Sequence, residues 1–511
     1  MQRNLAELQK GAFDLAVIGG GIVGASIARD AARRGLSVAL VEKDDFACAA
    51  SEAMSHLVHG GIRYLAQARF GMVRQSLAER AVWRRIAPLH VRPQPCLMPL
   101  AGKGRLGVAS MRAAVALFNS LGGREGAPSP QPAFVSARAA VAAEPALAMP
   151  GLEGALAWHD CRVDEPERVV LTLLVDAVAH GASVANHMEC TGLLRRNGRV
   201  AGIVVQDAIG RGRIEVRARG VINAAGPWAA ELAGRLATGQ KSARLTVSKG
   251  IHIVAGPIAR DAALNLAGRG EHGFVLPWRG MSLIGTTDDA IEGPRDRMSA
   301  QPDDVTRLAE RIARLLPSAR ELLAAPLATF ASARALPGDA ANTYRAAREE
   351  AIVDHAGDGA QGLFSAYGGK WTTARRMAEH VVDRVAAALD MKAGPCDTHT
   401  ALLPGTPDAD VPAFLAAWRG RLAGWPAEEA DSWVAAYGTS LPERLGKLPL
   451  DAGADRREAA RFAFAVEDEM AVTPADIARR LARSHGIARP GVEARAAEWL
   501  ARRAKVTDAG I

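Results

Sequence analysis

Four side chains in this sequence carry chemistry that suits an anion or a reacting hydroxyl group. Arg63 follows two glycines in HLVHGGIRYL and offers a fixed fork of donors that fits a phosphate or a carboxylate. Lys370 follows two glycines in YGGKWTT, at a predicted helix start where the helix dipole adds to its positive charge. Arg334 precedes a Pro-Gly turn in FASARALPGD, and His252 lies in TVSKGIHIV, where an imidazole suits general-base chemistry on an alcohol.

Each of these residues also has a purely structural interpretation. A lone histidine in an apolar strand is more often a core residue than a catalyst, so both interpretations of His252 stay open. Arg63 also fits a β-turn with a surface arginine, and Arg334 is unremarkable by itself. Thr372 and Thr373 either cap the predicted helix or bind a cofactor, and capping is the simpler role.

The elements that position these side chains begin with a β-α-β unit over residues 13–45. An apolar run ends at Gly19, Gly21 and Gly24, and a helical pattern follows. Glycines at this spacing permit a tight turn, the approach of a diphosphate and close helix–strand packing. A second apolar run ends at Glu42, where a carboxylate accepts hydrogen bonds from both ribose hydroxyls and disfavours NADP. The unit therefore predicts a dinucleotide site, although the motif alone does not separate FAD from NAD.

Two later segments repeat the order of strand, glycine turn and helix. VINAAGPWA contains Gly226, with Pro227 suited to the first helical turn, and LFSAYGGKWTTARRM contains Gly369. A short NAD domain needs one such turn. Three turns so far apart in the sequence indicate a long, deeply buried ligand, which favours FAD.

Composition sets the broad class. The 511 residues are 49% hydrophobic and 23% charged, which predicts two or three globular domains. No apolar run reaches the ~20 residues of a membrane span, and the first residues lack an apolar signal region, so we expect a cytoplasmic protein. The five cysteines form no CxxC pair, so we expect neither a metal site nor disulfides.

The formal net charge is +8, and two interpretations of it stay open. The simpler one is a set of solvated charged faces. The sharper one is attraction to an anionic substrate or an anionic membrane surface. Nucleic acid is disfavoured, because the arginines are spread along the chain and aromatic residues make up only 5% of it.

Taken together, these motifs resemble the FAD-dependent glycerol-3-phosphate dehydrogenases of the aerobic, quinone-linked type. The matching segments follow the family's order along nearly the whole chain, and the helical tail also resembles that of the family. They are IGGGIVGASIARDAARRGLSVALVE, HLVHGGIRYL, DCRVDEPERVV, VINAAGPWA, SKGIHIV, LPWRGMSLIGTTDD, FASARALPGD and SAYGGKWTTARRMAEHVVD.

The resemblance implies an α/β fold. It consists of a Rossmann-like FAD-binding domain of the glutathione-reductase/D-amino-acid-oxidase type, a mixed-sheet substrate domain and a C-terminal α-helical domain. The discontinuous FAD-binding domain is expected over about 1–88, 160–240 and 336–392, the inserted substrate domain over about 89–159 and 241–335, and the helical domain over 393–511.

The resemblance also implies roles for individual residues. Those implied to hold the ADP half of FAD are Gly19, Gly21, Gly24 and Glu42. Those implied to approach or close over the flavin half are Ser51, Ser55, Gly60, Gly61, Gly226, Gly369, Lys370 and Thr372. Those implied to bind the substrate phosphate or C2 oxygen are Arg63, Tyr64, Arg334 and Lys370. The implied catalytic residues are His252, Arg334 and Lys370, with His252 or Arg334 facing the reacting hydroxyl.

The implied reaction is the oxidation of sn-glycerol 3-phosphate to dihydroxyacetone phosphate. A base takes the C2 hydroxyl proton while hydride passes from C2 to flavin N5. Electrons then leave to a quinone, with the protein bound peripherally at the inner face of the cell membrane. A homodimer is left open.

The sequence departs from the family pattern near the implied site. The segment before HGG is usually rich in Ser and Thr and carries a Lys, whereas here it holds Glu52, Met54 and His56. Ala335 replaces the usual proline after the arginine of FASARALPGD. An acid at position 52 is unfavourable beside a diphosphate unless it points away or is paired.

These departures leave two alternatives open. One is a related FAD-dependent dehydrogenase or oxidase acting on another hydroxy acid, polyol phosphate or amino acid. The other is a catalytically silent FAD-binding protein, which the presence of Arg63, His252, Arg334 and Lys370 together disfavours.

Overall fold

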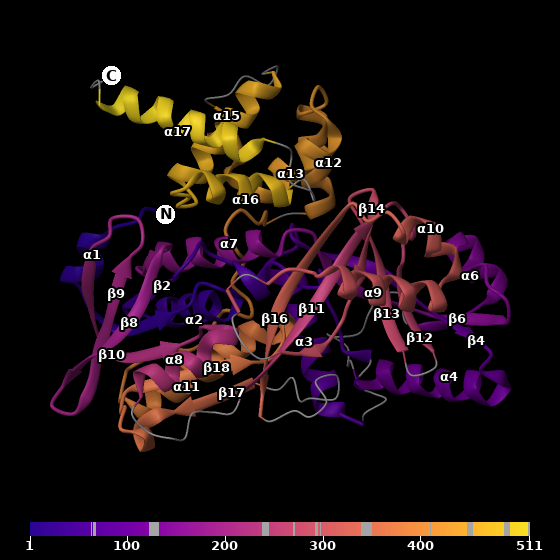
Figure 1. Ribbon diagram of the computed structural model, residues 1–511, viewed down its shortest axis with the longest axis horizontal. Helices are drawn as coiled ribbons and strands as arrows, with labels where there is room; N and C mark the ends of the chain where they lie inside the picture. Colours follow the sequence, from indigo (N-terminus) through magenta and orange to yellow (C-terminus); the bar gives the residue numbers. More distant parts are fainter. Residues whose placement is uncertain are drawn as a thin grey trace.

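The computed structural model describes the chain in twelve stretches. They are residues 1–62, 64, 68–121, 132–237, 245–268, 271–291, 295–296, 298–338, 350–408, 410–446, 453–484 and 491–508. Arg63, one of the predicted substrate-binding residues, lies outside them. Figure 1 shows two sheets side by side, with a helical region that closes the chain above the first sheet.

The first sheet contains the predicted β-α-β unit. Its main strands in spatial order are β17 (Glu350–Asp354), β18 (Leu363–Gly368), β10 (Arg213–Asn223), β1 (Ala12–Ile18), β2 (Val38–Val41) and β7 (Ser183–Ala185). The five strands from β18 to β7 are parallel, and β17 is antiparallel to β18. The antiparallel strands β8 (Met188–Arg196) and β9 (Arg199–Asp207) continue from the start of β10.

Helices cover both faces of this sheet, which explains why β2 and the last residues of β1 and β10 are buried without a break. Leu15 and Val17 of β1 face a core shared with α2 (Ile22–Arg33), α7 (Pro166–Ala179) and α11 (Ala374–Ala388). Ala16 and Ile18 face the opposite core, which includes α1 (Leu5–Lys10) and α8 (Ala229–Leu236). Successive side chains point to opposite faces, as the period of a strand requires.

The second sheet is mixed and larger. Its strands in spatial order are β15 (Asp289–Ala290), β11 (Leu245–Ala255), β14 (Met281–Gly285), β13 (Glu271–Trp278), β12 (Ala263–Gly268), β4 (Val91–Ala101), β6 (Leu152–Val163) and β3 (Leu57–Val58). In addition, β16 (Ala328–Pro337) pairs with β11, and β5 (Ala133–Ser136) pairs with β6. These strands come from distant parts of the chain.

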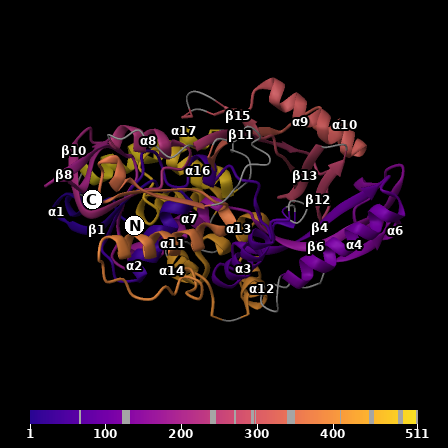
Figure 2. The ribbon, with the colours of Figure 1, turned by 90° about the horizontal axis from the view of Figure 1, so that it is seen from below.

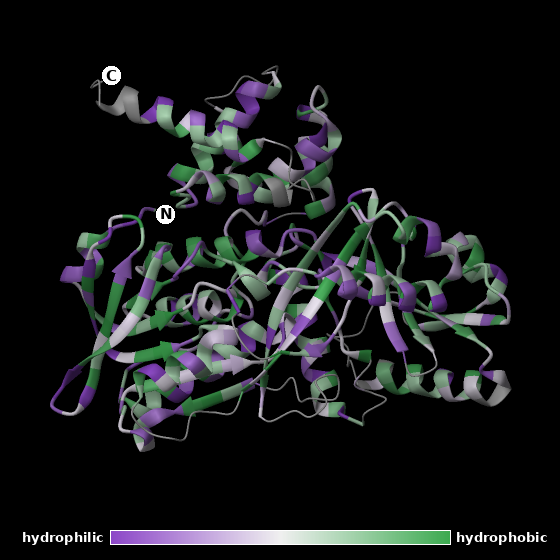
Figure 3. Ribbon diagram, viewed as in Figure 1, coloured by the Kyte–Doolittle hydropathy of each residue, from purple (hydrophilic) through white to green (hydrophobic). Residues whose placement is uncertain are grey.

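Helices pack on both sides of the second sheet as well. One core holds residues of α6 (Ala137–Ala143), α9 (Pro302–Leu315) and α10 (Arg320–Leu323). On the other side lie α4 (Gly104–Leu121) and, next to it, α3 (Phe70–Ile86). Figure 2, seen from below, shows α9 and α10 on the side of the sheet away from α4. Hydrophobic stretches run along interior strands, and hydrophilic residues gather on outer helices (Figure 3).

The C-terminal region is helical, as predicted. Its helices are α12 (Val411–Arg421), α13 (Ala427–Tyr437), α14 (Leu441–Leu445), α15 (Ala454–Glu467), α16 (Pro474–Ser484) and α17 (Val492–Asp508). They enclose two small apolar cores of their own, one around Trp433 and one around Ile477. In the part of the chain that the structure describes, no helix is both long and apolar enough to span a bilayer.

Candidate active site

A cavity of about 610 Å³ lies where the two sheets meet. Its wall includes the turn after β1, the loop that follows β2, the end of β10, and side chains of β11 and β16. The predicted site residues that line it are Gly19, Gly21, Glu42, Ser51, Ser55, Gly61, Gly226, His252, Arg334, Gly369, Lys370 and Thr372. The fold therefore brings together residues that are more than 350 positions apart in the sequence.

One end of the cavity is formed by the turn between β1 and α2. Gly19 has φ 111°, and a Cβ there would lie 2.6 Å from the carbonyl oxygen of Ala224. Gly24 is not in the wall, but a Cβ on it would lie 1.9 Å from the Gly19 carbonyl oxygen, so it keeps α2 against the turn. The amide of Ile22, at the start of α2, donates to Ser51 Oγ at 2.9 Å. This helix N-terminus presents amide groups and a partial positive charge to an anion.

Glu42 lies beside the same turn at the end of β2. Its Oε2 accepts from the Gly20 amide at 2.6 Å, and its Oε1 accepts from the Asp44 amide at 2.9 Å. Burial raises the pKa of this carboxyl. Each carboxylate oxygen has more than one lone pair, so Glu42 keeps acceptor capacity for ribose hydroxyls in the cavity.

The sequence left His252 open as a core residue or as a general base, and its position in the structure is compatible with both. The side chain belongs to β11, is only 1% exposed and stacks on Phe330 with a ring distance of 4.9 Å. It nevertheless lines the cavity, where its Nε2 lies 3.1 Å from Ser55 Oγ. Burial, and then the charge of Arg334, lower its pKa well below the usual value, so the imidazole is neutral near pH 7. Its Nδ1 is buried without a hydrogen-bond partner among the described residues.

Arg334 belongs to β16, and its side chain extends over the neighbouring strand β11. A Cβ on Gly250 would lie 1.9 Å from the guanidinium, which explains the glycine in SKGIHIV. The guanidinium donates to Thr286 Oγ1 at 2.7 Å and to the Thr287 carbonyl at 3.0 Å, and lies 3.4 Å from Asp288. These contacts hold its planar fork at the cavity wall.

Lys370 reaches the cavity from the turn between β18 and α11. Its Nζ donates to Ser76 Oγ at 2.6 Å and lies 4.4 Å from the centre of the Tyr64 ring. Tyr64 is buried behind Lys370 and is not part of the wall. Thr373 Oγ1 accepts from the Lys370 amide at 3.3 Å, so Thr373 makes the capping contact, while Thr372 lines the cavity.

Sequence reasoning missed Asp160, which organises the HGG turn. Its Oδ1 accepts from the Gly60 amide at 2.7 Å and from Arg80 at 3.0 Å, and its Oδ2 accepts from Trp158 Nε1 at 2.9 Å. Asp160 is 5% exposed and lines the cavity, whereas Gly60 packs behind it against Leu77. The available signal in the sequence was the single acid in the strand segment ALAWHDCRV.

The departures from the family pattern separate into two groups. Met54 and Ala335 line the cavity, whereas Glu52 and His56 do not. His56 is 5% exposed, and its Nδ1 lies 2.8 Å from the Val163 carbonyl. The acid at position 52 therefore does not face the space where a diphosphate would lie.

The cavity fits FAD by its own chemistry. Its volume of about 610 Å³ lies in the usual range for cofactor sites, about 300–1,000 Å³. Its wall contains a helix N-terminus, and at Gly21, Gly226 and Gly369 a ligand can approach the backbone without meeting a side chain. Among the described residues, Trp371 Nε1 and His252 Nδ1 are buried polar atoms of wall residues without a partner. Fold and site together define an FAD-dependent oxidoreductase of the Rossmann-like class.

Comparison with known proteins agrees with this class. The family described as FAD dependent oxidoreductase matches residues 14–384. Glycerol-3-phosphate dehydrogenases from Synechocystis sp. and Mycobacterium leprae are both 34% identical to the chain, over 79% and 77% of it and 75% and 66% of their own lengths. The aerobic glycerol-3-phosphate dehydrogenase of Staphylococcus saprophyticus is 32% identical over 76% of this chain and 69% of its own.

Solved structures extend the likeness to the C-terminal helices. The glycerol-3-phosphate dehydrogenase from Bacillus halodurans complexed with FAD has a TM-score of 0.77 at 25% identity, covering 98% of this chain and 92% of that one. The FAD-bound L-α-glycerophosphate oxidase from Mycoplasma pneumoniae shares the fold, with a TM-score of 0.57 at 19% identity over 77% of this chain and 99% of that one. The chain belongs to the FAD-dependent glycerol-3-phosphate dehydrogenase family. The predictions of fold class and of FAD are confirmed.

The buried His56 generates a prediction about pH and stability. Burial lowers its pKa from 6.5 to about 4, so between these values the unfolded chain binds a proton that the folded chain does not. Stability must therefore fall as the pH falls from 7 to 5, by about 2 kcal/mol for this one group. His56→Asn should remove that part of the loss, measured as the unfolding free energy at both pH values. The exposed His399→Asn is the control, and an unchanged pH dependence in His56→Asn contradicts the prediction.

Proposed function

We propose that this protein oxidises sn-glycerol 3-phosphate to dihydroxyacetone phosphate. The observation that carries the proposal is that one cavity wall holds a neutral imidazole, His252, and two cationic side chains, Arg334 and Lys370. A substrate with a secondary hydroxyl and a dianionic phosphate matches those groups. The names of the relatives described above support the same substrate.

In this proposal Arg334 and Lys370 bind the phosphate and the C2 oxygen. Arg334 is positioned by Thr286 and Thr287, so little side-chain freedom is lost when an anion binds. Tyr64 steadies the Lys370 ammonium through its ring, 4.4 Å away. The role of Arg63 as a further phosphate ligand rests on the sequence.

His252 is proposed to accept the C2 hydroxyl proton. Bound FAD supplies the two-electron acceptor for the hydride that leaves C2. Burial and the Arg334 charge both hold the pKa of free His252 low. A phosphate that pairs with Arg334 offsets part of that charge, so His252 becomes a stronger base when the substrate is bound. Ser55 Oγ, 3.1 Å from Nε2, orients the ring.

The proposal includes a membrane quinone as the electron acceptor, reached by peripheral contact at the inner face of the cell membrane. A formal net charge of +8 favours contact with anionic lipid surfaces. Turnover with a soluble quinone analogue, without hydrogen peroxide, supports this acceptor. Peroxide formed in proportion to substrate would instead identify an oxidase.

The first experiment is anaerobic mixing of the purified holoprotein with sn-glycerol 3-phosphate while flavin absorbance is followed. Rapid bleaching is expected, because hydride transfer reduces the flavin without any acceptor. Two compounds serve as controls: glycerol, which lacks the phosphate, and 3-phosphoglycerate, which carries a carboxylate in place of the C1 hydroxymethyl group. A flavoprotein that stays oxidised with sn-glycerol 3-phosphate contradicts the proposed substrate.

Arg334→Ala should lower kcat/KM for sn-glycerol 3-phosphate by about 10- to 100-fold, since it removes charge-assisted hydrogen bonds to the substrate. The bound flavin spectrum should stay normal. Steady-state kinetics with an artificial acceptor dye provide the measurement. Arg314→Ala, which removes an exposed arginine paired with Glu271, is the matched control. A rate equal to that of the control would remove Arg334 from the site.

His252→Asn should lower kcat by about 100-fold or more and leave KM within a few-fold, because a general base acts mainly in the transition state. The measurement is the pH dependence of kcat and KM for the variant and for the unchanged protein. If the rate and its pH profile survive the substitution, His252 is a core residue, and the base is another group.

A further inference from the structure

The loop that follows β2 forms part of the cofactor cavity in a strained conformation. Lys43, Asp44 and Cys48 of this loop line the cavity. Ala47 and Ala49 have positive φ angles of 65° and 60°, which residues with a Cβ rarely adopt. Such a conformation persists only where surrounding contacts determine it. The loop therefore needs support from outside itself.

The loop also sets the position of the glycine turn. The Ala47 amide donates to the Gly20 carbonyl at 3.0 Å. Phe46 is 1% exposed, and a Cβ on Gly20 would lie 2.7 Å from its ring. Glu42, which directly precedes the loop, accepts from the Gly20 amide at 2.6 Å. A shift of the loop therefore moves the backbone that faces the diphosphate.

The support comes from the C-terminal helical domain. Arg480 of α16 forms an ion pair with Asp45, and these side chains are only 4% and 1% exposed. Its neighbour Arg479 contacts Cys48 Sγ at the cavity wall. Asn186 Nδ2 bridges the two parts of the molecule, since it donates to Asp45 Oδ1 at 3.1 Å and to the Met470 carbonyl at 2.9 Å.

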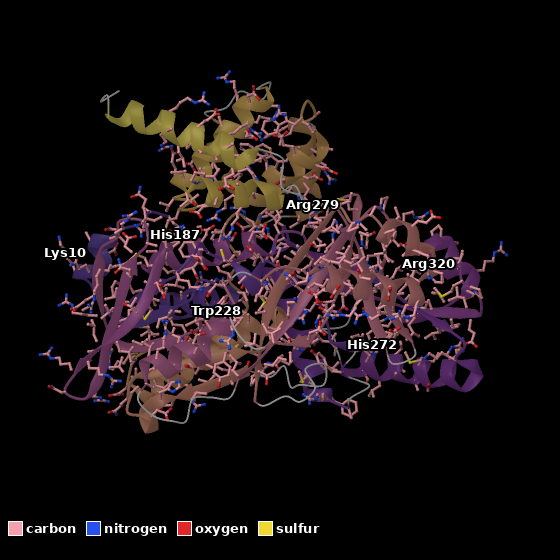
Figure 4. All side chains as sticks on the ribbon, in the orientation of Figure 1. Lys10, His187, Trp228, His272, Arg279 and Arg320 are labelled. Carbon is pink, nitrogen blue, oxygen red and sulfur yellow. The ribbon has the colours of Figure 1, made fainter. Side chains whose placement is uncertain are left out.

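A second contact lies beside this pair. The backbone amide of His187 donates to the Asp44 carbonyl at 2.9 Å. The ring Nε2 of His187 lies 2.9 Å from Asp476 Oδ2 of α16. Figure 4 shows His187 directly beneath the C-terminal helices. The loop is thus held at two successive residues, Asp44 and Asp45.

Arg480 is itself fixed by a buried chain of alternating charges. It donates to the Glu469 carbonyl at 3.2 Å. The Glu469 carboxylate binds Arg168 of α7 through two hydrogen bonds of 2.6 and 3.0 Å. All of these side chains are at most 8% exposed. Charges paired in this way hold one arrangement firmly, because any displacement leaves a buried charge without its partner.

We propose that the C-terminal helical domain is a clamp on the loop after β2, residues 43–49, which we call the cofactor loop. Arg480 and Asp45 are positioning residues for the ADP half of FAD. Arg480 lies outside the cavity wall and acts through Asp45 on the loop and on the glycine turn. The proposal concerns the binding of FAD alone. It therefore stands or falls independently of the substrate proposed above.

The test measures FAD affinity in full-length variants. Arg480→Met leaves Asp45 buried and unpaired, so the decisive variant is the double substitution Arg480→Met/Asp45→Asn, which removes both charges. Apoprotein is titrated with FAD by flavin fluorescence to obtain Kd. The melting temperature is measured with and without FAD, because the rise that FAD produces reports affinity separately from the stability of the apoprotein. Arg419→Met removes an exposed arginine paired with Asp431 in the same domain and is the control.

We expect the double variant to bind FAD at least about fivefold more weakly than the control and to show a smaller FAD-induced rise in melting temperature. A folded double variant whose Kd for FAD equals that of the control would falsify the clamp. A lower melting temperature of the apoprotein with an unchanged Kd would reduce the pair to a structural role and also overturn the proposal.

Discussion

The structure depends on a contact between three stretches of backbone that leaves no room for side chains. A Cβ on Gly24 would lie 1.9 Å from the Gly19 carbonyl oxygen, and a Cβ on Gly19 would lie 2.6 Å from that of Ala224. The start of α2, the end of β1 and the end of β10 therefore meet directly. This contact places a helix N-terminus at the cavity and puts the VINAAGPWA turn beside it, so one close approach builds two walls of the cofactor site.

The second sheet adds Arg334 and His252, two of the residues proposed to meet the substrate, and its geometry depends on the same kind of close approach. The Arg334 guanidinium crosses β11 over Gly250, whose missing side chain leaves the space. His252, two residues further along β11, then lies near a fixed positive charge that lowers its pKa in addition to burial. The electrostatics of the site thus follow from strand register, because β11 and β16 are antiparallel with Ser248 opposite Arg334.

Several features of the site had to wait for the tertiary structure, and each involves contacts between distant segments. Asp160 binds the Gly60 amide and Arg80, 100 and 80 residues away. Glu52 lies three residues before the cavity-lining Ser55 and His56 directly after it, yet neither lines the cavity. The loop after β2 is supported by Arg480, 435 residues later. No local pattern contains these pairings, since they arise from packing rather than from spacing along the chain.

The β-α-β unit, the FAD class and the helical character of the described C-terminal segments could be predicted from the sequence alone. These depend on local rules: where glycine is required for a turn, how apolar residues repeat in a strand or helix, and which acid ends β2. Only the tertiary structure decided which side chains face the cavity, that His252 is buried and neutral, and that α16 touches the cofactor loop. Those properties depend on desolvation and on charge–charge distance, and both are set by residues far apart in the sequence.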